Sequence, residues 1–178
     1  MLKKILVCLD GSKYAEGILP YAIERANRFH SEIILLRVID TPISACVAAI
    51  PAMTGQFVPV VAQPHLDGII RQDEIKNMSY LKKIASRLEN IGLDTESVTL
   101  RRTSGETIGD AIIRYAMKDK VDLIMMAIRK HNAWRRFVFG SVTESVIRKS
   151  VLPVLVVSPR THQVKESTLE NIPQISPA

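Results

Sequence analysis

The sequence predicts an α/β fold: a single doubly wound domain with a five-stranded parallel sheet and helices on both faces. Short runs rich in Val, Ile and Leu are continuous rather than alternating in polarity, as expected of strands buried on both faces. The segments between them carry apolar residues at helical spacing. Strands and helices that alternate in this way, joined by right-handed crossovers, form a parallel sheet covered on each side.

Each expected element has its own signal. The first apolar run ends at Asp10-Gly11-Ser12, residue types that favour a tight turn, and helical spacing begins at Tyr14. Gly92 marks the end of a later helix. In chain order we expect strand 5–9, helix 14–29, strand 33–38, helix 72–90, strand 96–100, helix 107–117, strand 121–127, a helix from residue 141 and strand 154–157.

Size and composition indicate one domain followed by a tail. The chain has 178 residues, of which 47% are apolar and 24% charged, values typical of a globular domain. The stretch after residue 157 contains three prolines and balanced charge. We therefore expect the domain at residues 1–159 and a loosely ordered tail at 160–178.

The expected compartment is the cytoplasm. Cys8 and Cys46 show neither metal nor redox spacing, which suits a reducing environment. The N-terminus lacks the long apolar stretch of a signal peptide or a membrane span. We therefore expect no membrane partner.

One segment, residues 41–70, does not fit the repeating unit. It is a long connection rich in Ala, Val and Pro, in which Asp67 is the only charged residue. Structureless connections of this length are usually functional in compact domains, so the segment could be a lid or a subunit contact. An insertion that packs on its own domain is an equal alternative, because its apolar residues require burial.

The best functional clue is the turn at Gly140-Ser141, which opens a helix. Gly140 lets a ligand approach the backbone, Ser141 offers a capping hydroxyl, and unpaired helix amides favour an anion such as phosphate. The alternative is that Ser141 merely caps the helix. The preceding segment is strongly basic within a chain of net charge +6 and contains Arg129, Lys130, His131, Arg135 and Arg136.

Ligands of doubly wound sheets bind at the carboxyl ends of the strands, where the strand order reverses. This rule brings the ends of the first and fourth strands to one crevice. Asp10 and the loop from Ala127 to Gly140 lie at those ends. Asp10 could accept hydrogen bonds from ribose hydroxyls, or it could be an ordinary turn residue.

The chain resembles the universal stress protein family over residues 1–159. The resemblance rests on segments 3–12 (KKILVCLDGS), 34–40 (ILLRVID), 121–126 (VDLIMM), 140–143 (GSVT) and 153–157 (PVLVV). It implies strand order 3-2-1-4-5, a small cytoplasmic homodimer with a role in the stress response, and a bound ATP or other adenine nucleotide whose phosphates Mg²⁺ could accompany.

Mapped onto this chain, the resemblance implies a nucleotide site. Leu9 and Asp10 would lie beside the adenine and ribose, and Val38 against the base. Met126 and Ala127 would lie under the nucleotide. The residues that would face phosphate are Gly140, Ser141, Val142 and Thr143.

The glycine motif of the family departs here at two positions. The family pattern has Gly, two residues, Gly, nine residues, Gly, then Ser or Thr, which places Ala127 and Lys130 where the first two glycines would stand. Lys130 restricts left-handed dihedrals and adds bulk, so it could block a phosphate cradle. Alternatively, Arg129 and Lys130 could hold phosphate oxygens by charge.

These observations leave two functions open. The first is a regulatory protein that binds ATP, ADP or AMP. The second is an interaction module of the same fold that has lost nucleotide binding, which the substitutions at Ala127 and Lys130 favour. An ATP-using enzyme would need a recognisable arrangement of nucleophile, base or metal ligands, and the sequence contains none that we can identify. The histidines have no metal spacing and stand at His30, His65, His131 and His162.

The expected partner is a second copy of the chain. The resemblance implies pairing through the last strand, Val154 to Val157, whose apolar edge needs a cover; the tail could also cover it. An unknown partner protein is also expected. Trp134 beside Arg135 and Arg136 could stack on nucleic acid, but a single aromatic is weak support, so we expect no nucleic acid.

Overall fold

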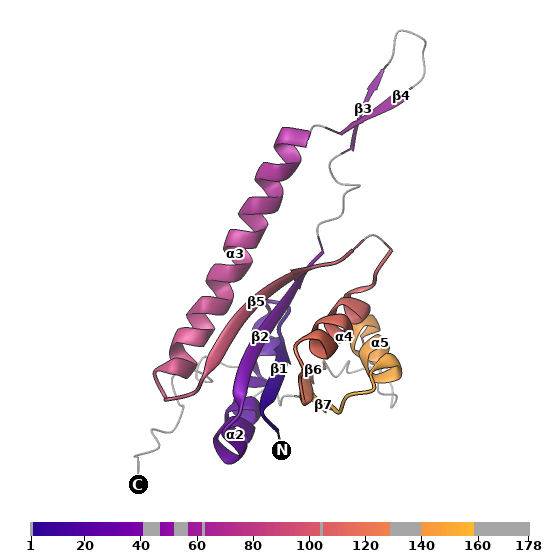
Figure 1. Ribbon diagram of the computed structural model, residues 1–178. Helices are drawn as coiled ribbons and strands as arrows, with labels where there is room; N and C mark the ends of the chain where they lie inside the picture. The colour runs from indigo at the N-terminus through magenta and orange to yellow at the C-terminus, as the bar shows by residue number, and fades with distance from the viewer. Residues whose placement is uncertain are drawn as a thin grey trace.

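The computed structural model describes residues 2–40, 47–51, 57–61, 63–103, 105–128 and 140–158 (Figure 1). The tail predicted at 160–178 and the basic residues between positions 129 and 139 lie outside these ranges. Within the described ranges, no helix is both long and apolar enough to cross a membrane.

The main sheet has five parallel strands, as predicted. They are β1 (Lys4–Cys8), β2 (Glu32–Ile39), β5 (Thr95–Arg101), β6 (Leu123–Ala127) and β7 (Val154–Val157). Their order across the sheet is β5-β2-β1-β6-β7, which confirms the predicted order 3-2-1-4-5. In the central strand Leu6 pairs with Ile34 of β2 and with Ile124 of β6. The strand therefore lies in the middle of the sheet, where both edges are hydrogen-bonded.

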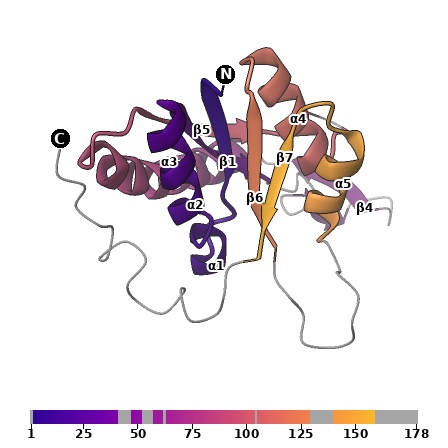
Figure 2. The same ribbon diagram turned by 90° about the horizontal axis from the view of Figure 1, so that it is seen from below.

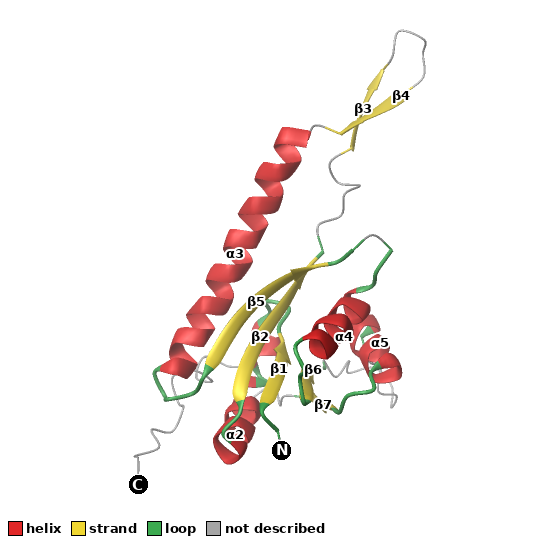
Figure 3. Cartoon of the chain, viewed as in Figure 1, coloured by secondary structure: helices red, strands yellow, loops and turns green. Residues whose placement is uncertain are grey.

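Helices cover both faces of this sheet (Figures 2 and 3). One face carries α1 (Lys13–Glu16), α2 (Leu19–Phe29) and α3 (Gln63–Glu89); the other carries α4 (Ile108–Lys118) and α5 (Ser141–Lys149). Alternate strand residues feed the two cores: Val7 and Leu35 pack on the first face, whereas Leu6, Ile34 and Leu36 pack on the second. The continuous apolar runs of the sequence thus supply two separate hydrophobic layers.

The first predicted helix, 14–29, is two helices. Pro20 stands at the second position of α2 and has no amide hydrogen, and its ring conflicts with the carbonyl four residues earlier. The chain therefore leaves α1 after Glu16 and restarts at Leu19. The predicted start of the fourth strand at residue 121 is also wrong, because the Val121 amide donates to the Ala116 carbonyl (2.9 Å) and still belongs to the end of α4.

The segment 41–70 is not structureless over its whole length. Strands β3 (Val47–Pro51) and β4 (Phe57–Val61) form an antiparallel hairpin, and α3 begins at Gln63, nine residues before the predicted start. Gly68 weakens the helical pattern of the first turns of α3, because glycine has a low helix propensity. In Figure 1 the hairpin lies beyond the N-terminal end of α3, away from the main sheet. A role as a lid or a subunit contact stays a prediction.

Truncation of Leu35 should destabilise the whole domain. Its side chain is completely buried in the core between the sheet and helices α1, α2 and α3. Leu35→Ala should therefore lower the free energy of unfolding by about 2–5 kcal/mol, because burial is lost and a cavity is left. Ile75→Ala on α3 is the matched control, because that side chain is 69% exposed; it should change stability by less than about 0.5 kcal/mol. Urea unfolding followed by circular dichroism measures both. Equal midpoints for the two variants would contradict the assignment of the core.

Candidate functional site

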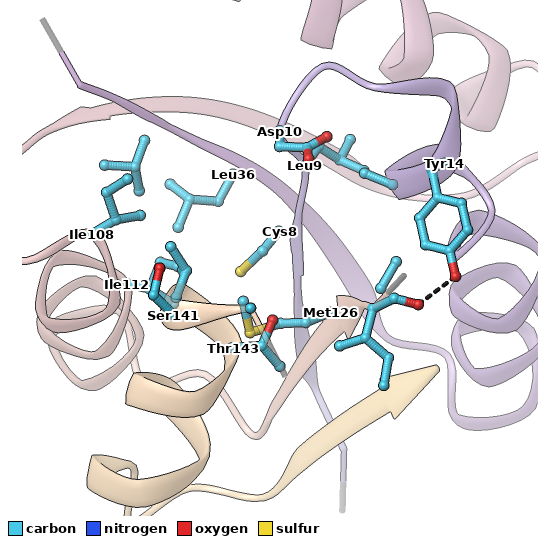
Figure 4. Close-up of a pocket in the computed structure, with 16 residues that line it drawn as sticks. Cys8, Leu9, Asp10, Tyr14, Leu36, Ile108, Ile112, Met126, Ser141 and Thr143 are labelled. Atoms are coloured by element: carbon cyan, nitrogen blue, oxygen red, sulfur yellow. Dashed lines mark hydrogen bonds between the residues drawn. The ribbon is translucent and has the colours of Figure 1, made fainter. Parts of the chain in front are cut away.

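A cavity of about 410 Å³ lies at the carboxyl ends of β1 and β6 (Figure 4). It is bounded by the ends of the central strands, by the turn after β1, and by the first turns of α4 and α5. All the predicted site residues that the structure describes line this cavity: Leu9, Asp10, Val38, Met126, Ala127, Gly140, Ser141, Val142 and Thr143. The other two, Arg129 and Lys130, lie outside the described residues. The strand order has thus brought four separated segments together.

The interior of the cavity is mainly apolar. In Figure 4 the sulfur atoms of Cys8 and Met126 point into it from β1 and β6, and Leu36 approaches from β2. Ile108 and Ile112 enter from α4. The sequence analysis missed Cys8, Leu36 and both isoleucines as lining residues, because their apolar spacing is equally that of core positions. Such a surface suits a flat, weakly polar group such as a nucleobase.

Cys8 is an uncharged part of this surface. Burial raises the pKa of its thiol to about 12, because a thiolate would lose its hydration there. The protonated form therefore predominates at neutral pH, and a thiol is a poor nucleophile. Cys8 thus acts as a small apolar group in the cavity.

The turn after β1 places a carboxylate at the rim. The Ser12 amide donates to Oδ1 of Asp10 (2.8 Å), and the Ala15 amide donates to the Ser12 hydroxyl (3.1 Å), which caps α1. Gly11 has φ +82°, a left-handed conformation that favours glycine. Asp10 is therefore a turn residue, which was one of the two roles considered for it; the other was acceptance of hydrogen bonds from a ribose. Asp10 also lines the cavity. One oxygen in the turn leaves a second that can accept from a ligand.

Tyr14 links three segments at the mouth of the cavity. Its hydroxyl donates to the Ile128 carbonyl, drawn as the dashed line in Figure 4, and lies 3.4 Å from the Ser158 hydroxyl. The contact fixes α1 to the residue after β6 and to the residue after β7. The sequence analysis used Tyr14 only as a helical apolar position, and nothing in its spacing predicts this role.

The start of α5 supplies backbone donors. Gly140 is the N-cap, with φ −60° and ψ 152°, and no side chain caps the helix. The prediction that Ser141 caps it is therefore wrong: Ser141 is the first helical residue, and its predecessor already occupies the extended cap position. The first helical bond runs from the Glu144 amide to the Gly140 carbonyl (2.9 Å). The amides of residues 141–143 precede it and have no acceptor within the helix.

The described residues do not crowd the N-cap beside these amides. A Cβ added at Gly140 would have none of their atoms within 4 Å, its chain neighbours aside. The amides and the positive end of the helix dipole together favour an anion there. Among the described residues that line the cavity there is no Lys or Arg. Within the described part of the chain, no cluster of His, Cys, Asp and Glu could hold a metal ion.

The alanine at the first glycine position fits its backbone. Ala127 is the last residue of β6 and pairs with Val157. Among the described non-glycine residues, positive φ values occur at His30 and Lys120 and not at Ala127. Its methyl group is therefore tolerated, as expected if φ is negative.

Comparison with known proteins supports the resemblance. The chain is 29% identical over 169 residues to universal stress protein MJ0577 of Methanocaldococcus jannaschii, with 88% of this chain and 95% of that protein covered. The solved structure of hypothetical protein MJ0577 matches with a TM-score of 0.69 at 26% identity and covers 90% of this chain and 98% of that one.

Two further structures share the fold. A universal stress protein from Archaeoglobus fulgidus, solved in complex with dAMP, matches with a TM-score of 0.55 at 21% identity, covering 89% of this chain and all of that one. A family protein from Arabidopsis thaliana, with AMP bound, matches with a TM-score of 0.58 at 14% identity, covering 90% and 94%. The profile of the Universal stress protein family matches residues 1–158. The chain therefore belongs to the universal stress protein family.

Proposed function

We propose that this protein is a regulatory protein that binds an adenine nucleotide in the cavity at the ends of β1 and β6. The observation that carries the proposal is the convergence of an apolar floor, the Asp10 carboxylate and the first turn of α5 on one cavity of about 410 Å³. This volume lies within the usual range for small-ligand sites, about 300–1,000 Å³. Relatives of the same fold bind AMP and dAMP.

The proposed pose follows from the chemistry of the lining. The base lies on the apolar surface between Val38 and Met126. The Asp10 carboxylate accepts from the ribose hydroxyls, because a carboxylate is an acceptor with two oxygens. The phosphate lies at the N-terminus of α5, near Ser141 and Thr143, where helix amides stabilise negative charge.

A second candidate is an interaction module that binds no nucleotide. Lys130 at a glycine position of the family motif favours it, since a side chain there can occupy the phosphate cradle. Ala127 gives this alternative less support, because its strand conformation accepts a methyl group. The two candidates differ in one measurable property, which is nucleotide affinity.

Purified protein should release a stoichiometric adenine nucleotide on denaturation, detected by mass spectrometry, or bind AMP, ADP or ATP in calorimetric titrations with and without Mg²⁺. Val38→Trp should lower the affinity at least about tenfold, because the indole fills the cavity beside the base. Ile75→Trp is the control, because Ile75 is 69% exposed and does not line the cavity. A purified protein that releases no nucleotide and binds none at millimolar concentration would favour the interaction module.

Bound nucleotide should protect Cys8 from alkylation. In a Cys46→Ser variant, iodoacetamide should modify Cys8 at pH 8 at least about a hundredfold more slowly than in unfolded protein, because a thiol whose pKa is about 12 holds little thiolate. The rate should still be rising at pH 11, and at each pH saturating AMP should lower it, since Cys8 lines the cavity. Mass spectrometry follows the reaction. A rate that AMP leaves unchanged would place the nucleotide elsewhere.

We also propose that the protein forms a homodimer through β7. This strand is at an edge of the sheet and is half-buried, and Val151 and Ile147, which are 79% and 40% exposed, precede it closely. Its paired side is identified by two bonds, from the Ile124 amide to the Pro153 carbonyl and from the Ile128 amide to the Val157 carbonyl. Because parallel ladders alternate, the backbone groups of Val154 and Val156 face the open edge.

Val156→Pro should therefore dissociate the dimer without breaking the sheet. Proline removes an outward amide and none of the bonds to β6. Val156→Ala keeps that amide and should remain dimeric. Light scattering after size-exclusion chromatography gives the mass of each variant. A wild-type protein with the mass of one chain would refute the dimer.

A further inference from the structure

A second cluster of polar side chains lies behind the turn that carries Asp10, on the sheet face covered by α3. Arg37 of β2 follows Leu35 by two residues, so both lie on this face of the sheet. Its guanidinium packs directly against Gly11: a Cβ built at Gly11 would lie 2.7 Å from Cζ of Arg37. The left-handed backbone favours glycine at this position, and the guanidinium occupies the space where a side chain would begin.

Tyr80 of α3 holds this guanidinium in place. Cζ of Arg37 lies 5.5 Å from the centroid of the Tyr80 ring, within the range of cation–π contacts. The Tyr80 hydroxyl donates to Oε1 of Glu16 (3.2 Å), a carboxylate that is only 8% exposed. Oε2 of Glu16 lies 3.4 Å from Nζ of Lys13. The aromatic ring is thus attached to α1, and the guanidinium is confined between α3 and the turn.

We propose that Arg37 is a positioning residue, which fixes the Asp10-Gly11 turn so that the Asp10 carboxylate points at the ribose of the bound nucleotide. This inference rests on the proposed function. The turn has two hydrogen bonds of its own, to the Asp10 carboxylate and to the Ser12 hydroxyl. Gly11 between them keeps the backbone freedom of glycine, which a contact from outside the turn restricts. The confined guanidinium provides it from the face opposite the cavity.

The role predicts a selective effect on ribose recognition. If Arg37 acts through Asp10, its removal should weaken ligands with ribose hydroxyls and spare those without them. A residue that only stabilises the fold would affect both kinds of ligand equally. AMP and 2′,3′-dideoxyadenosine monophosphate differ in these hydroxyls alone and serve as the two probes.

The variants are Arg37→Met, which keeps the aliphatic stem and removes the guanidinium, Asp10→Ala, and the double variant of the full chain. Calorimetry should show Arg37→Met weakening AMP about tenfold and the dideoxy analogue less than about twofold. In the Asp10→Ala background the same change should add nothing. Arg28→Met, an exposed site at the end of α2, is the matched control and should leave both affinities unchanged.

Variants at Tyr80 provide an independent test if Arg37→Met unfolds. Tyr80→Phe keeps the ring and should preserve the ratio of the two affinities, whereas Tyr80→Leu should reproduce the selective loss for AMP. Equal weakening of both probes, or additive losses in the double variant, would overturn the positioning role while leaving nucleotide binding intact. Wild-type protein that binds neither probe would overturn the proposed function and this inference together.

Discussion

The structure depends on the burial of β1 between β2 and β6. Each edge of this strand is paired in parallel register, and each face contributes to a different hydrophobic core, so the strand has no contact with water along its middle. A parallel sheet of this kind is stable only when both faces are covered. The helices that cover it come from connections leading outward from the centre in opposite directions. The cavity lies at the carboxyl edge, between the end of β1 and the end of β6.

The same constraint explains the chemistry of the cavity. Its floor consists of residues near the carboxyl ends of buried strands, such as Cys8 and Leu36, and is therefore apolar. Its rim consists of the turns that leave the sheet, where Asp10 and the first amides of α5 are available. An apolar floor beside a carboxylate and an anion-attracting helix end suits a molecule with a flat base, a sugar and a phosphate. Of the two departures from the family motif, Ala127 lines the cavity and Lys130 lies outside the described residues.

The rim is held by contacts on both of its sides. Tyr14 ties α1 to the ends of β6 and β7, whereas Arg37 and Tyr80 support the Asp10 turn from the opposite face. Helix α3 contributes Tyr80 and also carries the β3–β4 hairpin at its N-terminal end. The helix is therefore a physical connection between the turn at the cavity and the segment 41–70.

Local patterns in the sequence determined the five strands, their parallel arrangement and most of the helices, because burial on two faces leaves a direct trace in continuous apolar runs. They also identified the turn at Asp10-Gly11, since the left-handed backbone of Gly11 restricts residue type. The order 3-2-1-4-5 was predicted through the family resemblance rather than from periodicity. Of the nine described cavity positions, Asp10, Ala127, Gly140 and Ser141 were also identified from residue type or from their place at strand ends, whereas the other five came from the resemblance alone.

Only the tertiary structure decided which apolar residues line the cavity, since Ile108 and Cys8 have the same local pattern as core residues. It also decided that Gly140 rather than Ser141 is the N-cap, and it revealed the contacts of Tyr14, Arg37 and Tyr80. These contacts join residues far apart in the chain. Local sequence patterns report which face of an element is buried, but they carry no information about which distant side chain meets that face.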